Sequence, residues 1–215
     1  MKKLIYVVIM FFLVVSVSFS QGWGVGGGVS YLASSDLTNN SFGFNLIDKD
    51  ALPGFNINLR LKVDFGILAY TLNAGWNKFV VSNVEFTPPY GNTEGPSNFT
   101  LSQNIFPFTT GVQINVIGPE SGIFNIYAGG EISYSIISNS LDNGGQPGLP
   151  LTVVFEDAPR HRFGACPVAG IEFILGQVTW DVSMRFHFMN IVNRPIGEEL
   201  ASYFMINASV FFSNR

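Results

Sequence analysis

The stretch FNINLRLKVDF at residues 55–65 places an apolar side chain at every second position. Asparagine, arginine, lysine and aspartate stand between them. A repeat of two is typical of an extended strand whose two faces differ in polarity. In a soluble protein the charged face would meet water, whereas in a membrane β-barrel the apolar face meets lipid and the charges line the lumen. The fold therefore depends on which solvent surrounds this strand.

The beginning of the chain has the pattern of a signal peptide. Two lysines precede the apolar run 4–15, and small residues follow before Gln21. We predict a cleaved signal peptide at residues 1–20 and a single barrel domain at 21–215. A retained membrane anchor is disfavoured, because the run is shorter than the ~20 residues that a spanning helix needs.

The composition favours a surface that faces lipid. Charged residues make up 12% of the chain, and it contains 21 Phe and 23 Gly. The net charge is −4, so the basic patch of a nucleic-acid-binding protein is not expected. The single Cys166 cannot form an intramolecular disulfide. No metal-ligand spacing or phosphate loop appears, and we predict neither a metal site nor a cofactor.

Eight segments show the repeat of two, and the connections between them alternate between short and long. Antiparallel strands with tight turns at one end and long loops at the other produce this alternation. We predict an all-β fold, an eight-stranded antiparallel up-and-down transmembrane β-barrel with short periplasmic turns and long extracellular loops. The predicted strands are 23–34, 55–65, 67–81, 103–117, 123–138, 162–174, 178–189 and 202–212.

The two faces of these strands favour the membrane barrel over a soluble, lipocalin-like one. In the segment 178–189, for example, Trp180, Met184 and Phe186 alternate with Asp181 and Arg185. Turned inward, rings of such large apolar side chains would overfill an eight-stranded barrel. Turned outward, they have room. Four aromatic residues near the short turns would form an interfacial girdle, namely Trp23, Tyr70, Trp180 and Phe212.

Three segments resemble the small outer-membrane β-barrel family with OmpA-, OmpX- and OmpW-like members. Residues 105–137 are similar to its central hairpin, with the Y-x-G-G-x pattern at residues 127–131. FGACPVAGIEFIL at 163–175 is similar to a later G-x-G-x-E strand, and ASYFMINASVFF at 201–212 to the terminal strand. The resemblance implies a bacterial outer-membrane location and contact with membrane lipid.

Charged residues on the polar face should lie in the lumen. Eight strands enclose only enough space for side chains, so we expect these charges to form ion pairs that plug the barrel. A proton or ion path is the alternative. The predicted lumen charge cluster contains Arg60, Lys62, Asp64, Glu131, Glu172, Asp181 and Arg185.

An enzyme is a less favoured interpretation, and we predict no catalytic residue. Related small barrels include lipid A deacylases and palmitoyltransferases that use a histidine with a serine. Here Ser183 and His187 lie about 13 Å apart along one strand at ~3.3 Å per residue, too far for a dyad. His161 stands between Arg160 and Arg162, as expected for a basic loop end.

Two functions remain open. In the first, the barrel is a monomeric structural protein that contacts extracellular ligands or surfaces through loops at 35–54, 82–102, 139–161 and 190–201. In the second, as the resemblance to OmpW-like members implies, apolar loop residues form a pocket at the outer mouth that binds or passes small hydrophobic molecules. The predicted pocket contains Phe42, Phe44, Leu149, Leu151, Val153 and Phe155.

Overall fold

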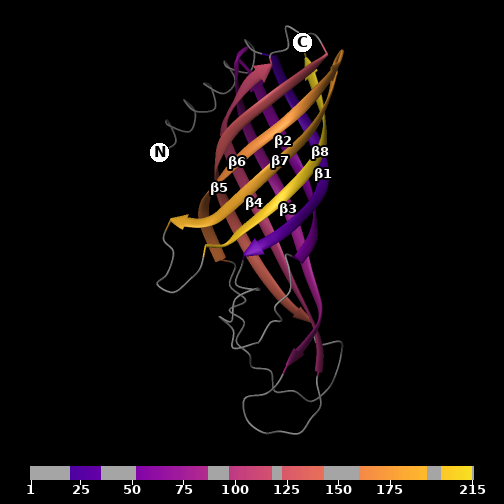
Figure 1. Ribbon diagram of the computed structural model, residues 1–215, viewed down its shortest axis with the longest axis vertical. Helices are drawn as coiled ribbons and strands as arrows, with labels where there is room; N and C mark the ends of the chain where they lie inside the picture. Colours follow the sequence, from indigo (N-terminus) through magenta and orange to yellow (C-terminus); the bar gives the residue numbers. More distant parts are fainter. Residues whose placement is uncertain are drawn as a thin grey trace, which may run out of the picture.

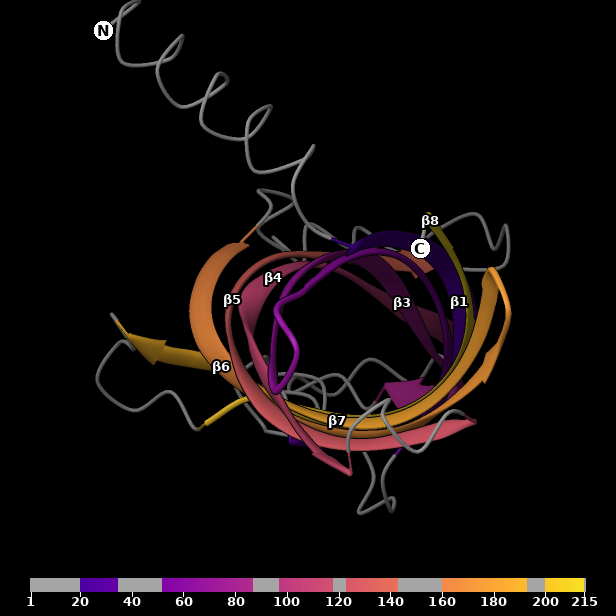
Figure 2. The ribbon, with the colours of Figure 1, turned by 90° about the horizontal axis from the view of Figure 1, so that it is seen from above.

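The chain forms a closed barrel of eight strands. The computed structural model describes residues 20–34, 52–86, 97–117, 123–142, 160–192 and 200–214. Each strand pairs antiparallel with its neighbour in the chain, and β8 pairs with β1, so that the sheet closes (Figures 1 and 2). The eight-stranded antiparallel barrel predicted from the sequence is confirmed. The strands are β1 (Ser20–Ser34), β2 (Leu52–Asp64), β3 (Leu68–Phe86), β4 (Ser97–Ile117), β5 (Phe124–Asp142), β6 (Arg160–Leu175), β7 (Val178–Val192) and β8 (Ser202–Asn214).

Glycines close two of the short turns. Gly66 lies between β2 and β3 with φ of 85°, and Gly176 lies between β6 and β7 with φ of 65°. Positive φ carries no steric cost for glycine, which explains why the chain reverses at these two positions. In the first turn the Phe65 amide donates to the Leu68 carbonyl at 2.8 Å. The turn expected at 118–122 lies outside the described residues.

Several strands continue into ranges that the sequence pattern predicted as loops. β3 reaches Phe86 and β4 begins at Ser97, so this hairpin extends beyond the other strands at the loop end (Figure 1). The register of the pair shifts between Val81 and Val84. Because such an irregularity changes the phase of the alternation, the repeat of two breaks while the backbone pairing continues.

The opening stretch 55–65 shows which face meets the outside. The side chain of Leu59 is 50% exposed on the outer wall, whereas its neighbour Arg60 is 1% exposed in the lumen. The same alternation holds for Leu61 outside and Lys62 inside. Exposed Val, Ile, Leu and Phe side chains from all eight strands cover the outer wall, which is the arrangement of transmembrane barrels.

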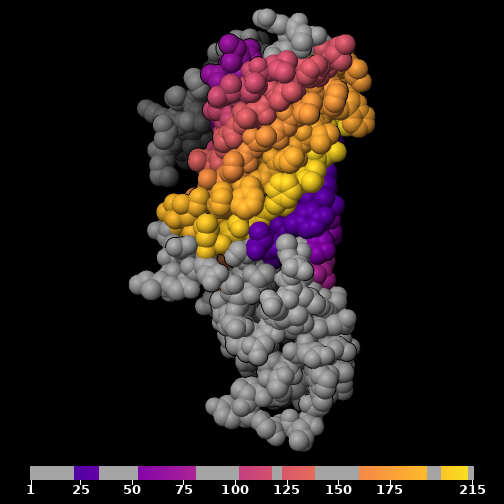
Figure 3. Space-filling view, viewed as in Figure 1, coloured from indigo at the N-terminus to yellow at the C-terminus, as the bar shows by residue number. Residues whose placement is uncertain are grey.

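The strands tilt strongly around the barrel axis. Figure 3 shows them as sloping bands that lie side by side over one face. Near the short turns, Trp23, Trp180 and Phe212 are exposed on the outer wall, and the rings of Trp23 and Phe212 are 5.0 Å apart. Tyr70 also lies near this end, because it is the third residue of β3. These four residues occupy the positions of the predicted aromatic girdle.

None of the described residues forms a helix that is long and apolar enough to cross a membrane.

Candidate functional site in the barrel lumen

Arg60 and Asp181 form an ion pair between two distant walls of the lumen. Arg60 is on β2 and Asp181 is on β7, and Arg60 Nη1 lies 3.0 Å from Asp181 Oδ1. Both side chains are buried. These strands are not neighbours in the barrel, so the long arginine side chain crosses the interior to reach its partner.

Lys62 forms a second ion pair one step closer to the short turns. Its Nζ donates to both carboxylate oxygens of Glu172 on β6, at 2.7 and 2.8 Å. Asp64 Oδ1 lies 3.2 Å from the same nitrogen, with its side chain 30% exposed. Asn125 Nδ2 donates to Glu172 Oε2 at 2.9 Å. The buried ammonium therefore has three carboxylate oxygens around it, two of which accept its hydrogen bonds, as a desolvated charge requires.

Arg185 and Glu131 form the third ion pair. Arg185 Nη1 lies 2.7 Å from Glu131 Oε2, and both side chains are buried. Two threonines from the adjoining strands β4 and β3 also bind this carboxylate. Thr71 Oγ1 donates to Glu131 Oε1 at 3.1 Å, and Thr109 Oγ1 donates to Oε2 at 2.5 Å. Three hydrogen bonds thus hold the two charged groups in one geometry.

Tyr127 joins the Arg60 pair and was missed in the sequence analysis of the lumen. Its hydroxyl donates to Asp181 Oδ2 at 2.6 Å and accepts from Arg60 Nη1 at 3.3 Å. The Arg60 guanidinium also lies 5.3 Å from the ring centre of Phe211. The signal was present in the sequence, because Tyr127 falls on the inward phase of its strand together with Asn125 and Glu131.

The seven predicted lumen residues therefore lie in three ion pairs, with Asp64 beside the second pair. Six of them are buried and Asp64 is half-buried at the turn end. Three cations face four carboxylates, so most of the charge is neutralised within the lumen. Such an arrangement is suited to closing and rigidifying the interior. Among the described residues, no group of three or more His, Cys, Asp or Glu side chains could hold a metal ion.

Gly111 makes room for the Glu131 side chain. The two residues pair across β4 and β5, and Gly111 faces the lumen. A Cβ at this position would overlap the Gly130 carbonyl oxygen and lie 2.8 Å from Glu131 Cγ. Glycine is therefore required at position 111, where the Glu131 side chain passes on its way to the two threonines.

Gly111→Ala should lower the free energy of unfolding by about 1 to 3 kcal/mol, the usual cost of overpacking. Urea titration of the folded fraction in lipid vesicles measures this change. Gly130→Ala is the matched control, because its Cβ would meet no atom within 4 Å. Equal stability of both variants would contradict the role assigned to Gly111.

Above the ion pairs the lumen becomes more apolar. Side chains at the loop end of their strands point inward and are fully or almost fully buried, among them Leu32, Phe79, Ile105 and Met189. Tyr203 stacks on His187 with ring centres 4.4 Å apart and an angle of 4° between the planes.

The histidines form no serine dyad among the described residues. His187 is fully buried, and neither of its ring nitrogens nor Ser183 Oγ has a hydrogen-bond partner there. His161 lies on the outer wall, where its Nδ1 is 2.6 Å from the Tyr134 hydroxyl. In the described part of the chain, no serine hydroxyl is hydrogen-bonded to either histidine. The predicted mouth pocket, from Phe42 and Phe44 to Leu149, Leu151, Val153 and Phe155, lies outside the described residues.

Three solved structures have a similar path of the backbone. Neisserial surface protein A (NspA) matches with a TM-score of 0.47 and 13% identity, over 90% of this chain and 96% of that one. The outer membrane protein OprG from Pseudomonas aeruginosa matches with a TM-score of 0.42 and 12% identity, over 91% and 94% of the two chains. The Yersinia pestis outer membrane protein Ail matches with a TM-score of 0.38 and 12% identity, over 91% and 100%.

No family model matches the chain, and a search of curated proteins finds no match.

Proposed function

We propose that this chain is a monomeric integral protein of the bacterial outer membrane, exported by a signal peptide at residues 1–20. The exposed apolar wall supports this location, because a soluble barrel buries such side chains in its interior. Cell fractionation followed by gel electrophoresis of unheated and heated samples tests it. An outer-membrane band that changes mobility on heating is expected. Recovery of the protein as a soluble periplasmic monomer would contradict the proposal.

The interior acts as a plug rather than as a pore. The observation that supports this is the set of three ion pairs that cross the lumen from β2, β5, β6 and β7. Opposite charges at these distances attract strongly in a poorly hydrated interior, and opening the lumen would leave them without partners. Function then resides at the loop end of the barrel.

Wild-type protein in planar lipid bilayers should show no steady open channel. Replacing Arg60 and Lys62 together by alanine removes both cations from the lower lumen and leaves Asp181 and Glu172 unpaired. We expect this double variant to unfold at lower urea concentration and to admit small currents. A stable wild-type conductance that persists unchanged in the double variant would show that ions pass by a route outside the cluster.

At the loop end, the barrel acts as a surface-interaction protein. The observation that carries this function is the extension of β3, β4 and β5 beyond the rim. Among the described residues, the last pairing of β3 with β2 is at Phe79 and the last pairing of β5 with β6 is at Ile137, whereas β3 continues to Phe86 and β5 to Asp142. The outer strands of such an extended sheet are suited to pairing with an extended partner segment.

A peptide library in extended form tests this interaction. Phage-displayed peptides are selected against the wild-type barrel in lipid nanodiscs. The control variant replaces residues 82–100 by Asn-Gly, which can join Val81 to its partner Leu101 and keeps the barrel wall intact. We expect the selected peptides to bind the wild type and to lose binding to the trimmed variant. Equal binding to both would contradict a role of the extension.

The second candidate function is binding or passage of small hydrophobic molecules at the outer mouth. The inward apolar side chains Leu32, Phe79, Ile105 and Met189 favour it, since they line the lumen at the loop end of the strands. Titration of tryptophan fluorescence with alkanes tests this candidate. Saturable binding that is lost in Val153→Asp would favour the pocket over the interaction function. Absence of binding would contradict the hydrophobic-pocket function.

A further inference from the structure

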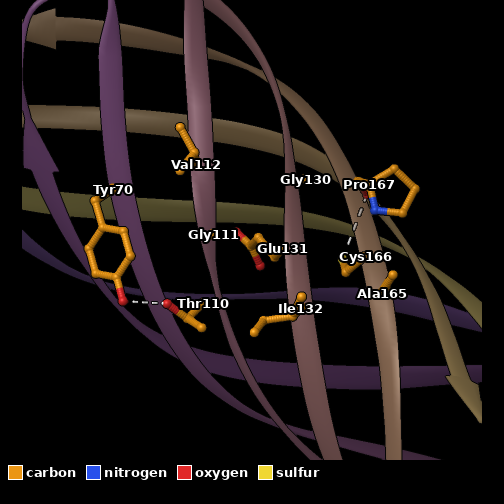
Figure 4. Close-up of a pocket in the computed structure, with 10 residues that line it drawn as sticks. All are labelled: Tyr70, Thr110, Gly111, Val112, Gly130, Glu131, Ile132, Ala165, Cys166 and Pro167. Atoms are coloured by element: carbon orange, nitrogen blue, oxygen red, sulfur yellow. Dashed lines mark hydrogen bonds between the residues drawn. The ribbon is translucent and has the colours of Figure 1, made fainter. Parts of the chain in front are cut away.

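A pocket of about 540 Å³ lies in the outer wall over β3 to β6 (Figure 4). Its floor is at Gly130, where a Cβ would meet no atom within 4 Å. Val112, Ile132 and Pro167 surround this glycine. Ile132 is 69% exposed on the outer face, so the pocket opens away from the lumen. In a membrane it would face the hydrocarbon of the bilayer.

One end of this pocket carries a pair of hydroxyl groups. Thr110 Oγ1 donates to the Tyr70 hydroxyl oxygen at 2.6 Å, and both side chains lie on the outer wall (Figure 4). Two hydroxyls carry two protons, and the hydrogen bond between them uses one. The pair can therefore donate a further hydrogen bond to an acceptor in the pocket. The rest of the lining is almost entirely apolar.

The pocket rises into the membrane from this polar end. Leu72, Thr110, Ile132 and Ala165 are successive pairing partners across β3, β4, β5 and β6. Leu72 is near the short-turn end of β3, whereas Ala165 is far from the short-turn end of β6. Movement across the strands from β3 to β6 therefore leads away from the turns. The hydroxyl pair lies at the level of the predicted aromatic girdle, and the apolar part lies deeper.

We infer that this pocket binds one acyl chain of a glycerophospholipid, with its ester carbonyl accepting a hydrogen bond from the Tyr70 and Thr110 hydroxyls. An ester places a hydrogen-bond acceptor at the interface and a hydrocarbon chain directly below it, which matches the order of groups along the pocket. Gly130 supplies the depth that the chain occupies. The inference rests on the proposed location of the barrel in a membrane.

Native mass spectrometry of the full-length mature barrel tests the inference. The protein is released from detergent with increasing amounts of a diacyl phosphatidylethanolamine or of its dialkyl ether analogue, which lacks the carbonyl. We expect the first diacyl lipid to bind each barrel more tightly than any further lipid molecule does. Tyr70→Phe should weaken this binding by about three- to tenfold, the effect of one hydrogen bond. The ether lipid should bind the wild type as weakly as the diacyl lipid binds Tyr70→Phe. Tyr70→Phe should not weaken the binding of the ether lipid further.

Gly130→Val fills the pocket and should abolish the preference for the first lipid. The matched control is Ala208→Val, which enlarges an exposed side chain on β8 at the other side of the barrel. Equal lipid binding by wild type, Gly130→Val and Ala208→Val would overturn the inference, and so would self-association of the wild type through this wall in place of lipid binding. If the barrel inserts into membranes, such results leave the proposed location intact. Failure of the wild type to insert would instead contradict both proposals.

Discussion

Glu131→Gln is expected to lower the free energy of unfolding by about 3 to 5 kcal/mol, because it leaves the buried Arg185 without a counter-charge. The substitution keeps the shape of the side chain. Glu131 accepts from Arg185 at 2.7 Å and from Thr71 and Thr109, so an uncharged amide loses the charge-assisted bond and places an NH₂ group where an acceptor is needed. The penalty is that of an unpaired charge and not of one lost hydrogen bond.

Asp64→Asn provides the matched control for this variant. It is also an acid-to-amide change at a residue that contacts a lumen cation, with Lys62 Nζ at 3.2 Å. The Asp64 side chain is 30% exposed, and Lys62 keeps its two contacts with Glu172. We expect a loss below about 1 kcal/mol, as for solvent-accessible ion pairs. Urea titration of the folded fraction in lipid vesicles measures both variants.

The double variant Glu131→Gln with Arg185→Gln separates charge from packing. Removing both charges should recover at least half of the stability lost in Glu131→Gln, because no unpaired charge then remains. If Glu131→Gln is within about 0.5 kcal/mol of wild type, the lumen solvates Arg185 well, and the plug would be refuted as a source of rigidity. Additive losses in the double variant would likewise contradict a direct coupling.

The closed barrel could be predicted because one local feature decides both its strands and its faces. Polar and apolar side chains alternate along each strand. The large apolar side chains are too many for the interior of a narrow barrel, so this face is assigned to the outer wall. Arg60 and Lys62 were assigned to the lumen from this phase alone, and both are buried there. Strand ends were less predictable. At Val81 to Val84 the register shifts, so the pattern ends before the pairing does.

The partners within the lumen were less predictable than its members. Arg60 and Lys62 could be placed level with Glu172 and Asp181, because all four lie close to a short turn. The sequence does not show which cation pairs with which carboxylate, since that depends on the tilt and stagger of the strands. Tyr127 shows a different reason. Its phase is inward, but the sequence does not show that its hydroxyl meets the Asp181 carboxylate. The apolar upper lumen was not predicted either. Phe79 and Ile105 point inward according to the alternation, but their apolar side chains are of the kind expected on the outer wall.

Leu59→Arg should lower the free energy of unfolding in lipid vesicles by about 2 to 4 kcal/mol, the cost of an arginine near the middle of a bilayer. Leu59 is 50% exposed on the outer wall of β2, between Val25 of β1 and Ala74 of β3. If that wall faced water, the same change would be within about 0.5 kcal/mol of wild type. The sign and size of the effect therefore identify the solvent.

Ile67→Arg is the depth control for this prediction. Ile67 is 72% exposed and lies in the turn between β2 and β3, where an arginine reaches water or lipid head groups. Its expected cost is about 0 to 1 kcal/mol, as for positions near the membrane interface. Both variants are measured by urea titration in the same vesicles. Equal costs at the two positions would contradict a bilayer around the barrel. Only a hydrocarbon layer would make arginine costly at position 59 and not at position 67, which lies eight residues further along the same hairpin.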